Sequence, residues 1–188
     1  MRSLHQQRLL DLLAGHVPAD ALEREHLARI AAFVAVEPAC FSRRTFEPGH
    51  ITGSGFVVDP ARRLLLLHHH RKLDRWLQLG GHDDGELDAA ATALREAREE
   101  SGLAQVALAQ EPPAVLDVDV HAIPAGAGEP AHLHFDLRFL FFADSSQPLA
   151  LDAAESRALC WLPLAEAPVR MGEVGALRVA RKIEAALR

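Results

Sequence analysis

Cysteine and clustered basic residues are scarce in this sequence, and each scarcity excludes a class of protein. The two cysteines, Cys40 and Cys160, lie far apart without a CxxC pair. They predict isolated thiols in a reducing compartment, although one disulfide between them stays open. The formal net charge is −6 and no Lys/Arg block offsets it, so nucleic acid is not expected as the main partner.

Long apolar runs are also missing, since none approaches the roughly 20 residues needed to span a bilayer. The opening residues, MRSLHQQRLLDLLAG, interrupt a short apolar pattern with His, Gln and Asp, unlike a signal peptide. We therefore expect a cytoplasmic protein that does not enter a membrane. Its 188 residues, 49% hydrophobic and 24% charged, allow one domain with a substantial core and a small extension.

The periodicity of apolar residues predicts two helices followed by a region of mixed elements. Helical spacing covers residues 4–14 and about 19–36. We expect strands at 50–59, 62–70, 75–79, about 105–110, 114–123, 131–143 and 158–164, and helices at about 87–101 and 173–187. Strands interleaved with few helices predict an α/β fold, in which residues 46–188 form the domain and residues 1–45 form a helical extension.

The extension carries an apolar stripe formed by Leu4, Leu9, Leu12 and Leu13. A one-sided apolar helix buries that side against a partner surface. We expect the stripe to form a homodimer interface or to cover the substrate cleft of the domain.

The helix expected at 87–101 carries an unusual group of charges. Glu96, Glu99 and Glu100 lie near its C-terminal end, where anions face the negative end of the helix dipole and repel one another. At 100° per residue they cluster opposite an alanine-rich face. Grouped carboxylates suit Mg²⁺ or Mn²⁺, which would offset the repulsion and hold a pyrophosphate. The alternative is a solvated charged face, which mixtures of Glu and Arg often form.

The segment LGGHDDGELDAAATALREAREESGL (79–103) resembles the Nudix box, G-x5-E-x7-R-E-U-x-E-E-x-G-U, where U is aliphatic. The residues that match keep the spacing of the motif and are Gly81, Arg95, Glu96, Ala97, Glu99, Glu100, Gly102 and Leu103. The resemblance covers at least residues 50–165. It implies a Nudix-like α/β/α sandwich with a mixed sheet.

The sequence departs from the motif before the helix. Counted from Gly81, the first glutamate of the box should stand at position 87, which is Leu87, whereas Glu86 comes one residue early. That glutamate orients the box in the family, so Glu86 would serve from a shifted turn, or Asp83 or Asp84 would take part. The proline that usually precedes the paired glycines is also replaced, by a leucine at position 79.

The resemblance implies a hydrolase of nucleoside diphosphates linked to another moiety. In such enzymes divalent cations bridge the phosphates, and water attacks one phosphorus. By this resemblance Glu96, Glu99 and Glu100 are metal ligands or position the water, and the backbone carbonyl of Gly81 is a further ligand. The expected cofactor is Mg²⁺ or Mn²⁺.

Other residues of the box have structural roles in the family. The resemblance assigns Arg95, Glu86 and Gly102 to holding the box in shape. The general base often comes from a late loop outside the box. Glu155, just before the strand at 158–164, is the first candidate for it, and Asp136 is the second.

The strand expected at 131–143 has polar side chains on one face, which are His132, His134, Asp136 and Arg138. These four are candidates for substrate binding, and a solvent-facing strand would show the same pattern. The three histidines at 68–70 alternate between the faces of a strand, so they are not expected to bind one ion together.

Two other readings remain open. An isoprenoid-diphosphate isomerase shares the fold and uses histidine and glutamate ligands, but the hydrolase-type box disfavours it. A non-catalytic regulatory module on the same scaffold tends to lose box glutamates, and this chain keeps the main three. The motif does not name the substrate, because selectivity within the family lies in variable loops.

Overall fold

The computed structural model describes residues 2–126 and 128–188, which form five helices around one eight-stranded sheet. The strands are β1 (Gly49–Asp59), β2 (Leu64–His70), β3 (Arg75–Leu77), β4 (Leu79–His82), β5 (Ala107–Leu108), β6 (Asp117–Ile123), β7 (His132–Phe142) and β8 (Ser156–Pro163). The helices are α1 (Leu4–Ala14), α2 (Ala21–Val36), α3 (Ala89–Ser101), α4 (Ala167–Met171) and α5 (Ala176–Ala186). Every helix among these residues is too short or too polar to span a membrane.

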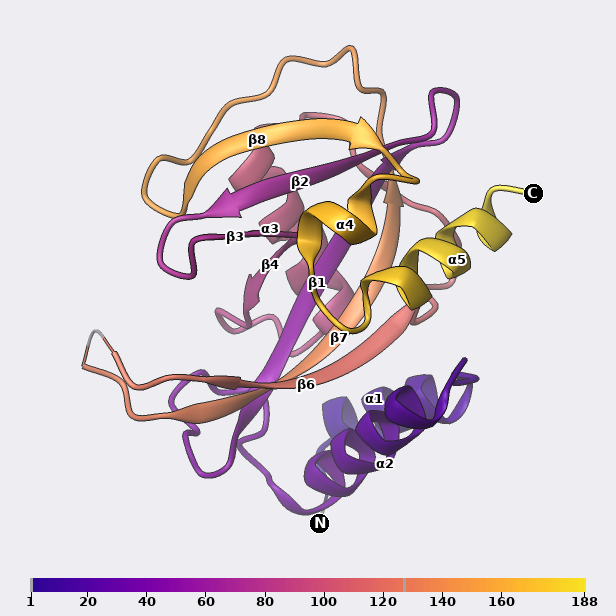
Figure 1. The fold of residues 1–188 in the computed structure, drawn as a ribbon. Coiled ribbons are helices and arrows are strands. Elements are labelled where there is room, and N and C mark those ends of the chain that lie inside the picture. Colours follow the sequence, from indigo (N-terminus) through magenta and orange to yellow (C-terminus); the bar gives the residue numbers. More distant parts are fainter. Residues whose placement is uncertain (1, 127) are drawn as a thin grey trace.

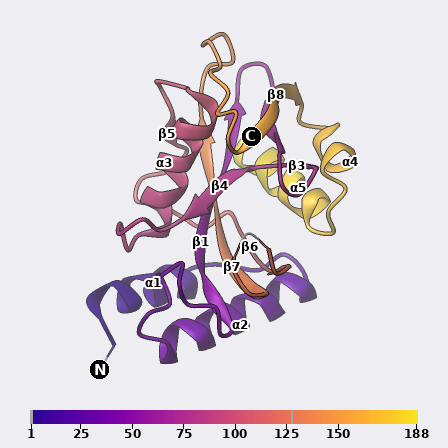
Figure 2. The same cartoon turned by 90° about the vertical axis from the view of Figure 1, so that its left-hand side faces the viewer.

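Strand β1 is the centre of the mixed sheet and is buried along its whole length. It runs parallel to β7, and its other edge pairs antiparallel with β2 and with β4. Strands β5 and β6 extend the sheet beyond β7, and β3 and β8 extend it beyond β2. Figure 2 shows α3 on one side of these strands and α4 and α5 on the other. The expected α/β sandwich with a mixed sheet is therefore confirmed.

Helix α3 lies unusually close to β1 because both surfaces are made of small residues. A Cβ atom at Gly53 of β1 would lie 2.3 Å from the carbonyl oxygen of Ala89. Ala93 and Ala97 on the facing side of α3 are fully buried. The helix ends at Gly102, whose φ of 69° is the left-handed conformation that glycine adopts without strain.

The N-terminal helices share the core of the sheet. Figure 1 shows α1 and α2 lying together beside β6. The ring of Phe33 on α2 stacks on that of Phe135 on β7 with centroids 4.2 Å apart. Of the expected apolar stripe, Leu9 and Leu13 are buried within this chain, whereas Leu4 is 63% exposed. Leu9 and Leu13 therefore belong to the core of this chain, and a homodimer interface or a cover over the substrate cleft stays a prediction.

Buried charges join α2, β6 and α5. Arg178 on α5 donates hydrogen bonds of 2.7 and 2.9 Å to Asp117 on β6, and it also contacts Asp20, which caps α2. Lys182 contacts Asp117 at 3.2 Å and pairs with Glu23 of α2. Burial opposes ionisation of Glu23, but hydrogen bonds from His16 and Lys182 outweigh it and hold the pKa of Glu23 well below its usual range. These pairs connect the two ends of the described chain.

The structure differs from the sequence interpretation in several short segments. Residues 80–82 lie beyond the strand expected at 75–79 but belong to β4, because two consecutive glycines let the strand pair closely with β1. The strand expected at 105–110 is reduced to Ala107–Leu108. Helix α4 was not expected, since five residues are too few for a helical period to show.

The buried network predicts a large loss of stability when Asp117 loses its charge. Asp117→Asn should lower the free energy of unfolding by about 3 kcal/mol or more, because Arg178 and Lys182 would lose their buried counter-charge. Urea denaturation would measure this change. The matched control is Asp74→Asn, which breaks an exposed pair with Arg157 and should change stability little. Equal effects of the two substitutions would contradict the prediction.

Candidate active site

The paired glycines of β4 bring the strand against the carboxylate end of α3. A Cβ atom at Gly81 would lie 2.4 Å from Oε1 of Glu96, so only glycine leaves room for this carboxylate. The backbone N–H of Gly80 donates a hydrogen bond of 2.8 Å to Oε2 of Glu100. The first and third glutamates of the cluster are thus both packed against β4.

Arg95 holds the box together by donating to several acceptors. One of its terminal nitrogens lies 2.9 Å from Oε1 of Glu96 and 2.8 Å from Oε2 of Glu99. Its other terminal nitrogen donates to the carbonyl oxygen of His82 at 2.7 Å. One guanidinium therefore offsets the repulsion between two glutamates and ties α3 to the end of β4.

The displaced glutamate of the box also reaches Arg95. Glu86 accepts hydrogen bonds from Arg95 at 3.2 Å and from the Thr92 hydroxyl at 3.1 Å. The turn before it is tight, because the Asp83 carboxylate accepts from three consecutive backbone N–H groups, those of residues 85–87. Leu87, at the expected glutamate position, has a positive φ of 52°. Glu86 thus contacts Arg95 even though it stands one residue before the glutamate position of the motif, because the turn before the helix is shifted.

Glu100 is the buried member of the cluster. One of its oxygens lies 3.3 Å from Nδ1 of His68, and that nitrogen lies 2.7 Å from the Ser156 hydroxyl. Burial, together with the negative charges of Glu96, Glu155 and Asp152, raises the pKa of Glu100 to about 8, although the N–H of Gly80 opposes the shift. Burial also raises the pKa of Glu96. The site thus concentrates more negative charge than Arg95 neutralises.

The donor set fits a hard divalent cation. Three carboxylates and the backbone carbonyl of a glycine are the oxygen ligands that Mg²⁺ and Mn²⁺ prefer. Burial is the main cause of the raised pKa of Glu100 and the neighbouring carboxylates add to it, so a bound cation would favour the ionised form. Glu99, with its side chain 58% exposed, is the member that faces solvent.

The other expected site residues are divided between two environments. Glu155 directly precedes β8, on the side of Glu100. Asp136 and Arg138 are 1% exposed and pair with each other at 3.0 Å inside the sheet. His132 is buried and His134 is half-buried, and both lie at the N-terminal end of the same strand. Substrate binding by these four residues of β7 stays a prediction.

Sequence interpretation missed the residues that surround Glu100. His68 and Ser156 come from the antiparallel strands β2 and β8, which pair with each other outside the box. Burial and the charges of its two neighbouring histidines lower the pKa of His68 to about 4, so its imidazole is neutral at pH 7. The alternation of residues 68–70 indicated which histidines share a face, but it gave no sign that one would meet a box glutamate.

Comparison with known proteins identifies this arrangement. The sequence matches the NUDIX domain family over residues 50–182. A C. elegans Ap4A hydrolase complex is similar in structure, with a TM-score of 0.57 and 18% identity, covering 73% of this chain and 96% of that one. A MutT NUDIX hydrolase from Burkholderia pseudomallei has a TM-score of 0.52 and 22% identity, covering 71% and 96%. These low identities show a shared fold.

The chain belongs to the Nudix domain family, because the match covers most of its length. With the box glutamates in place it is an enzyme of that family, a Nudix pyrophosphohydrolase. The E. coli dihydroneopterin triphosphate pyrophosphohydrolase has the same fold, with a TM-score of 0.52 and 13% identity over 70% of this chain and 92% of that one. No curated protein gives a significant match.

The contact between Gly81 and Glu96 predicts a substitution that damages the site more than the fold. Gly81→Ala should displace the Glu96 carboxylate, which ends a flexible side chain, and so weaken Mg²⁺ binding in calorimetry with a small change in melting temperature. Gly53→Ala instead meets the backbone of α3 at 2.3 Å and should cost about 1–3 kcal/mol of stability. Gly126→Ala, with open space around it, is the neutral control. A Gly81 variant that binds Mg²⁺ like wild type would refute this.

The raised pKa of Glu100 predicts how stability depends on pH in chelator. Between its ordinary pKa of 4.5 and about 8, the folded protein holds a proton that the unfolded chain has lost. Stability from this group is therefore greatest at low pH and falls as pH rises to 8, by at most about 1.4 kcal/mol per pH unit. Glu100→Gln should remove this slope and be more stable than wild type at pH 8. Urea denaturation of both proteins at pH 5 and pH 8 measures the difference, and parallel pH profiles would contradict it.

Proposed function

We propose that the chain hydrolyses the pyrophosphate linkage of a nucleoside diphosphate joined to another moiety, with Mg²⁺ or Mn²⁺ as its cation. One observation carries this proposal. Three carboxylates that repel one another are gathered at one end of α3, and each is held by Arg95 or by the backbone of β4. A solvated charged face would not need such contacts.

The box residues have two roles at the cation site, as ligands and as groups that orient the ligands. Glu96, Glu99 and Glu100, with the carbonyl of Gly81, would be its ligands. When bound, the cation neutralises phosphate charge and makes the phosphorus more electrophilic. Arg95 keeps Glu96 and Glu99 oriented before any ligand arrives, which lowers the cost of assembling the site.

Hydrolysis also needs a base that accepts one proton from the attacking water. Water adds to one phosphorus, the bridging P–O bond breaks, and a carboxylate accepts the proton that water loses. We assign this base to Glu155. Its charge acts on Glu100, and its backbone carbonyl accepts a hydrogen bond of 2.8 Å from the N–H of Arg71, which anchors the loop before β8.

A panel of candidate substrates is the best way to identify the substrate, because the variable loops of the family determine selectivity. Two similar structures are named for Ap4A and for dihydroneopterin triphosphate, and both compounds belong in the panel beside nucleotide sugars and coenzymes. Isopentenyl diphosphate tests the isomerase alternative. A regulatory module would bind a nucleotide derivative without cleaving it.

Loss of the most exposed box glutamate should abolish turnover and leave the fold intact. Glu99→Gln should lower kcat by at least about 100-fold on the best panel substrate, because it removes an anionic ligand near the reacting phosphates. Its melting temperature in chelator should match that of wild type or exceed it slightly, since the change relieves repulsion on α3. Released phosphate or nucleoside monophosphate reports the rate.

The control for this experiment is Glu25→Gln, an exposed glutamate on α2 whose loss should leave the rate unchanged. Wild-type activity should also vanish in excess EDTA and return with Mg²⁺. Full turnover by the Glu99 variant, or by the chelated enzyme, would defeat the proposed mechanism.

A further inference from the structure

Three histidines from three different strands converge on the face of the sheet opposite α3. His50 of β1, His82 of β4 and His134 of β7 have ring centroids 5.0 to 5.1 Å apart in every pair. One ring nitrogen from each lies within 4.8 Å of the other two. No acidic side chain takes part in this triad, so it differs in chemistry from the box carboxylates.

His50 has one ring nitrogen without a hydrogen-bond partner among the described residues. Its Nδ1 lies 3.0 Å from the carbonyl oxygen of Thr45, which only accepts, so Nδ1 carries the hydrogen. Nε2 of the neutral ring is then an acceptor, and it is buried without a hydrogen-bond partner. The side chain as a whole is 1% exposed. A buried polar atom without a partner is costly unless a ligand satisfies it.

The other two histidines have the spacing of ligands on one metal ion. Nε2 of His82 lies 3.3 Å from Nε2 of His134. Two nitrogens bound tetrahedrally to zinc at about 2.0–2.1 Å would lie about 3.3 Å apart. Burial, together with the charges of the surrounding histidines, lowers the pKa of His82 to about 4 and that of His134 to about 2. Both rings are therefore neutral at pH 7, the state in which imidazole binds metals.

Two further histidines pack around the triad and leave it accessible. His132 packs on His50 with centroids 5.0 Å apart, and its Nδ1 is held by the carbonyl of Pro130. His121, whose ring lies 5.4 Å from that of His134, is held at Nδ1 by Asp119. Within the triad, Nδ1 of His50 is held by the carbonyl of Thr45, which is the kind of contact that fixes the orientation of a metal-binding imidazole. His82 and His134 are only half-buried, so an ion can enter from solvent.

We propose that His50, His82 and His134 form a binding site for a divalent transition metal of the zinc type, separate from the magnesium site of the box. Neutral imidazoles suit Zn²⁺, Co²⁺, Ni²⁺ or Cu²⁺, whereas Mg²⁺ prefers oxygen ligands. Three protein ligands leave a fourth position for water or for an anionic group. The two sites share β4, because Gly81 faces α3 and His82 points to the opposite face. A bound ion would join β1, β4 and β7, and it would so restrain β4, the strand that contains the paired glycines of the box.

Titration of the metal-free full chain with Zn²⁺ tests the site. The protein is stripped with chelator, exchanged into chelator-free buffer with millimolar Mg²⁺, and titrated against a chromophoric zinc indicator. One Zn²⁺ per chain should bind with a Kd below about 1 μM, and Zn²⁺ should raise the melting temperature. Co²⁺ should give the visible absorption of a tetrahedral ion.

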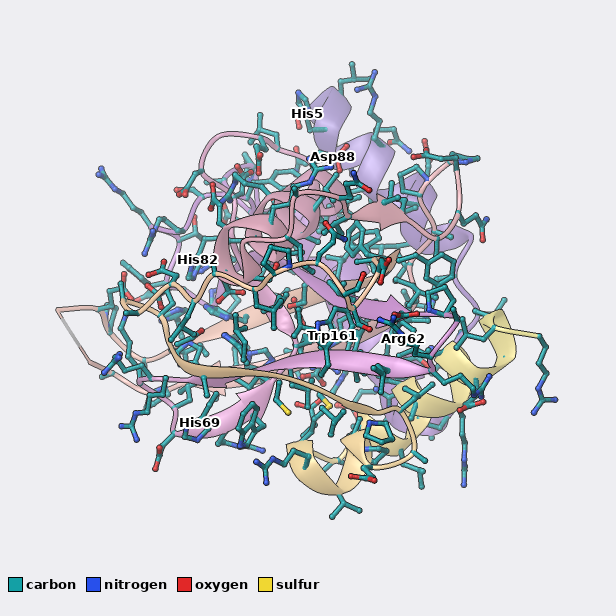
Figure 3. The ribbon with its side chains drawn as sticks, turned by 90° about the horizontal axis from the view of Figure 1, so that it is seen from above. His5, Arg62, His69, His82, Asp88 and Trp161 are labelled. Carbon is teal, nitrogen blue, oxygen red and sulfur yellow. The ribbon has the colours of Figure 1, made fainter. Side chains whose placement is uncertain are left out.

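Single substitutions then locate the ion. His82→Gln and His134→Gln should each weaken Zn²⁺ binding by at least about 100-fold and remove the cobalt absorption, because each removes one of three ligands. His5→Gln and His69→Gln are matched controls, since both are half-buried histidines outside the triad. Figure 3 shows His5 and His69 well apart from His82. Glu99→Gln should also bind Zn²⁺ like wild type, which distinguishes this site from the box.

The proposal is independent of the substrate of the enzyme. Failure of wild type to bind Zn²⁺ in millimolar Mg²⁺ would overturn it. So would unchanged binding by both His82→Gln and His134→Gln, since the ion would then lie elsewhere. Circular dichroism of the metal-free variants checks that they fold, and His50→Gln provides a third ligand substitution if either of them does not.

Discussion

The parallel pairing of β1 with β7 is the constraint on which the polar face of the central sheet depends. Its register sets three polar pairs side by side on one face, which are His50 with His134, Thr52 with Asp136, and Ser54 with Arg138. A shift of one residue would turn these side chains toward α3, where glycine and alanine leave no space. The same strand receives β4 on its other edge, so the box and the histidine triad are both built on β1.

The carboxylate cluster shows how the protein keeps like charges together before a ligand arrives. Arg95 neutralises part of the charge through Glu96 and Glu99, and burial favours the protonated form of Glu100. A cation and a proton therefore act as alternatives at the same carboxyl group. The glycines at 80 and 81 make this possible, since any side chain there would meet Ser54 or Glu96.

Local patterns in the sequence predicted much of the fold and the position of the box carboxylates on one helix. The helix that carries Glu96, Glu99 and Glu100 was expected at 87–101 and covers Ala89–Ser101, because helical spacing and the glycine that ends it are local signals. The histidine triad could not be predicted, since it depends on the register of β1 with β4 and β7. Arg138 was expected at a cleft or in solvent, and no local pattern distinguishes those positions from its buried ion pairs.

The ion pairs at Asp117 have a consequence for how this sequence can diverge. Asp117 is fully buried, and its partners Arg178 and Lys182 also contact Asp20 and Glu23 of the N-terminal extension. The family match begins at residue 50, so the extension lies outside it, yet its acidic residues complete a charge balance inside the matched region. A relative that lost the two helices would keep cations without their full complement of anions. The extension and the charges on β6 and α5 therefore act as one electrostatic unit, so removing the helices alone would leave Arg178 and Lys182 with fewer counter-charges.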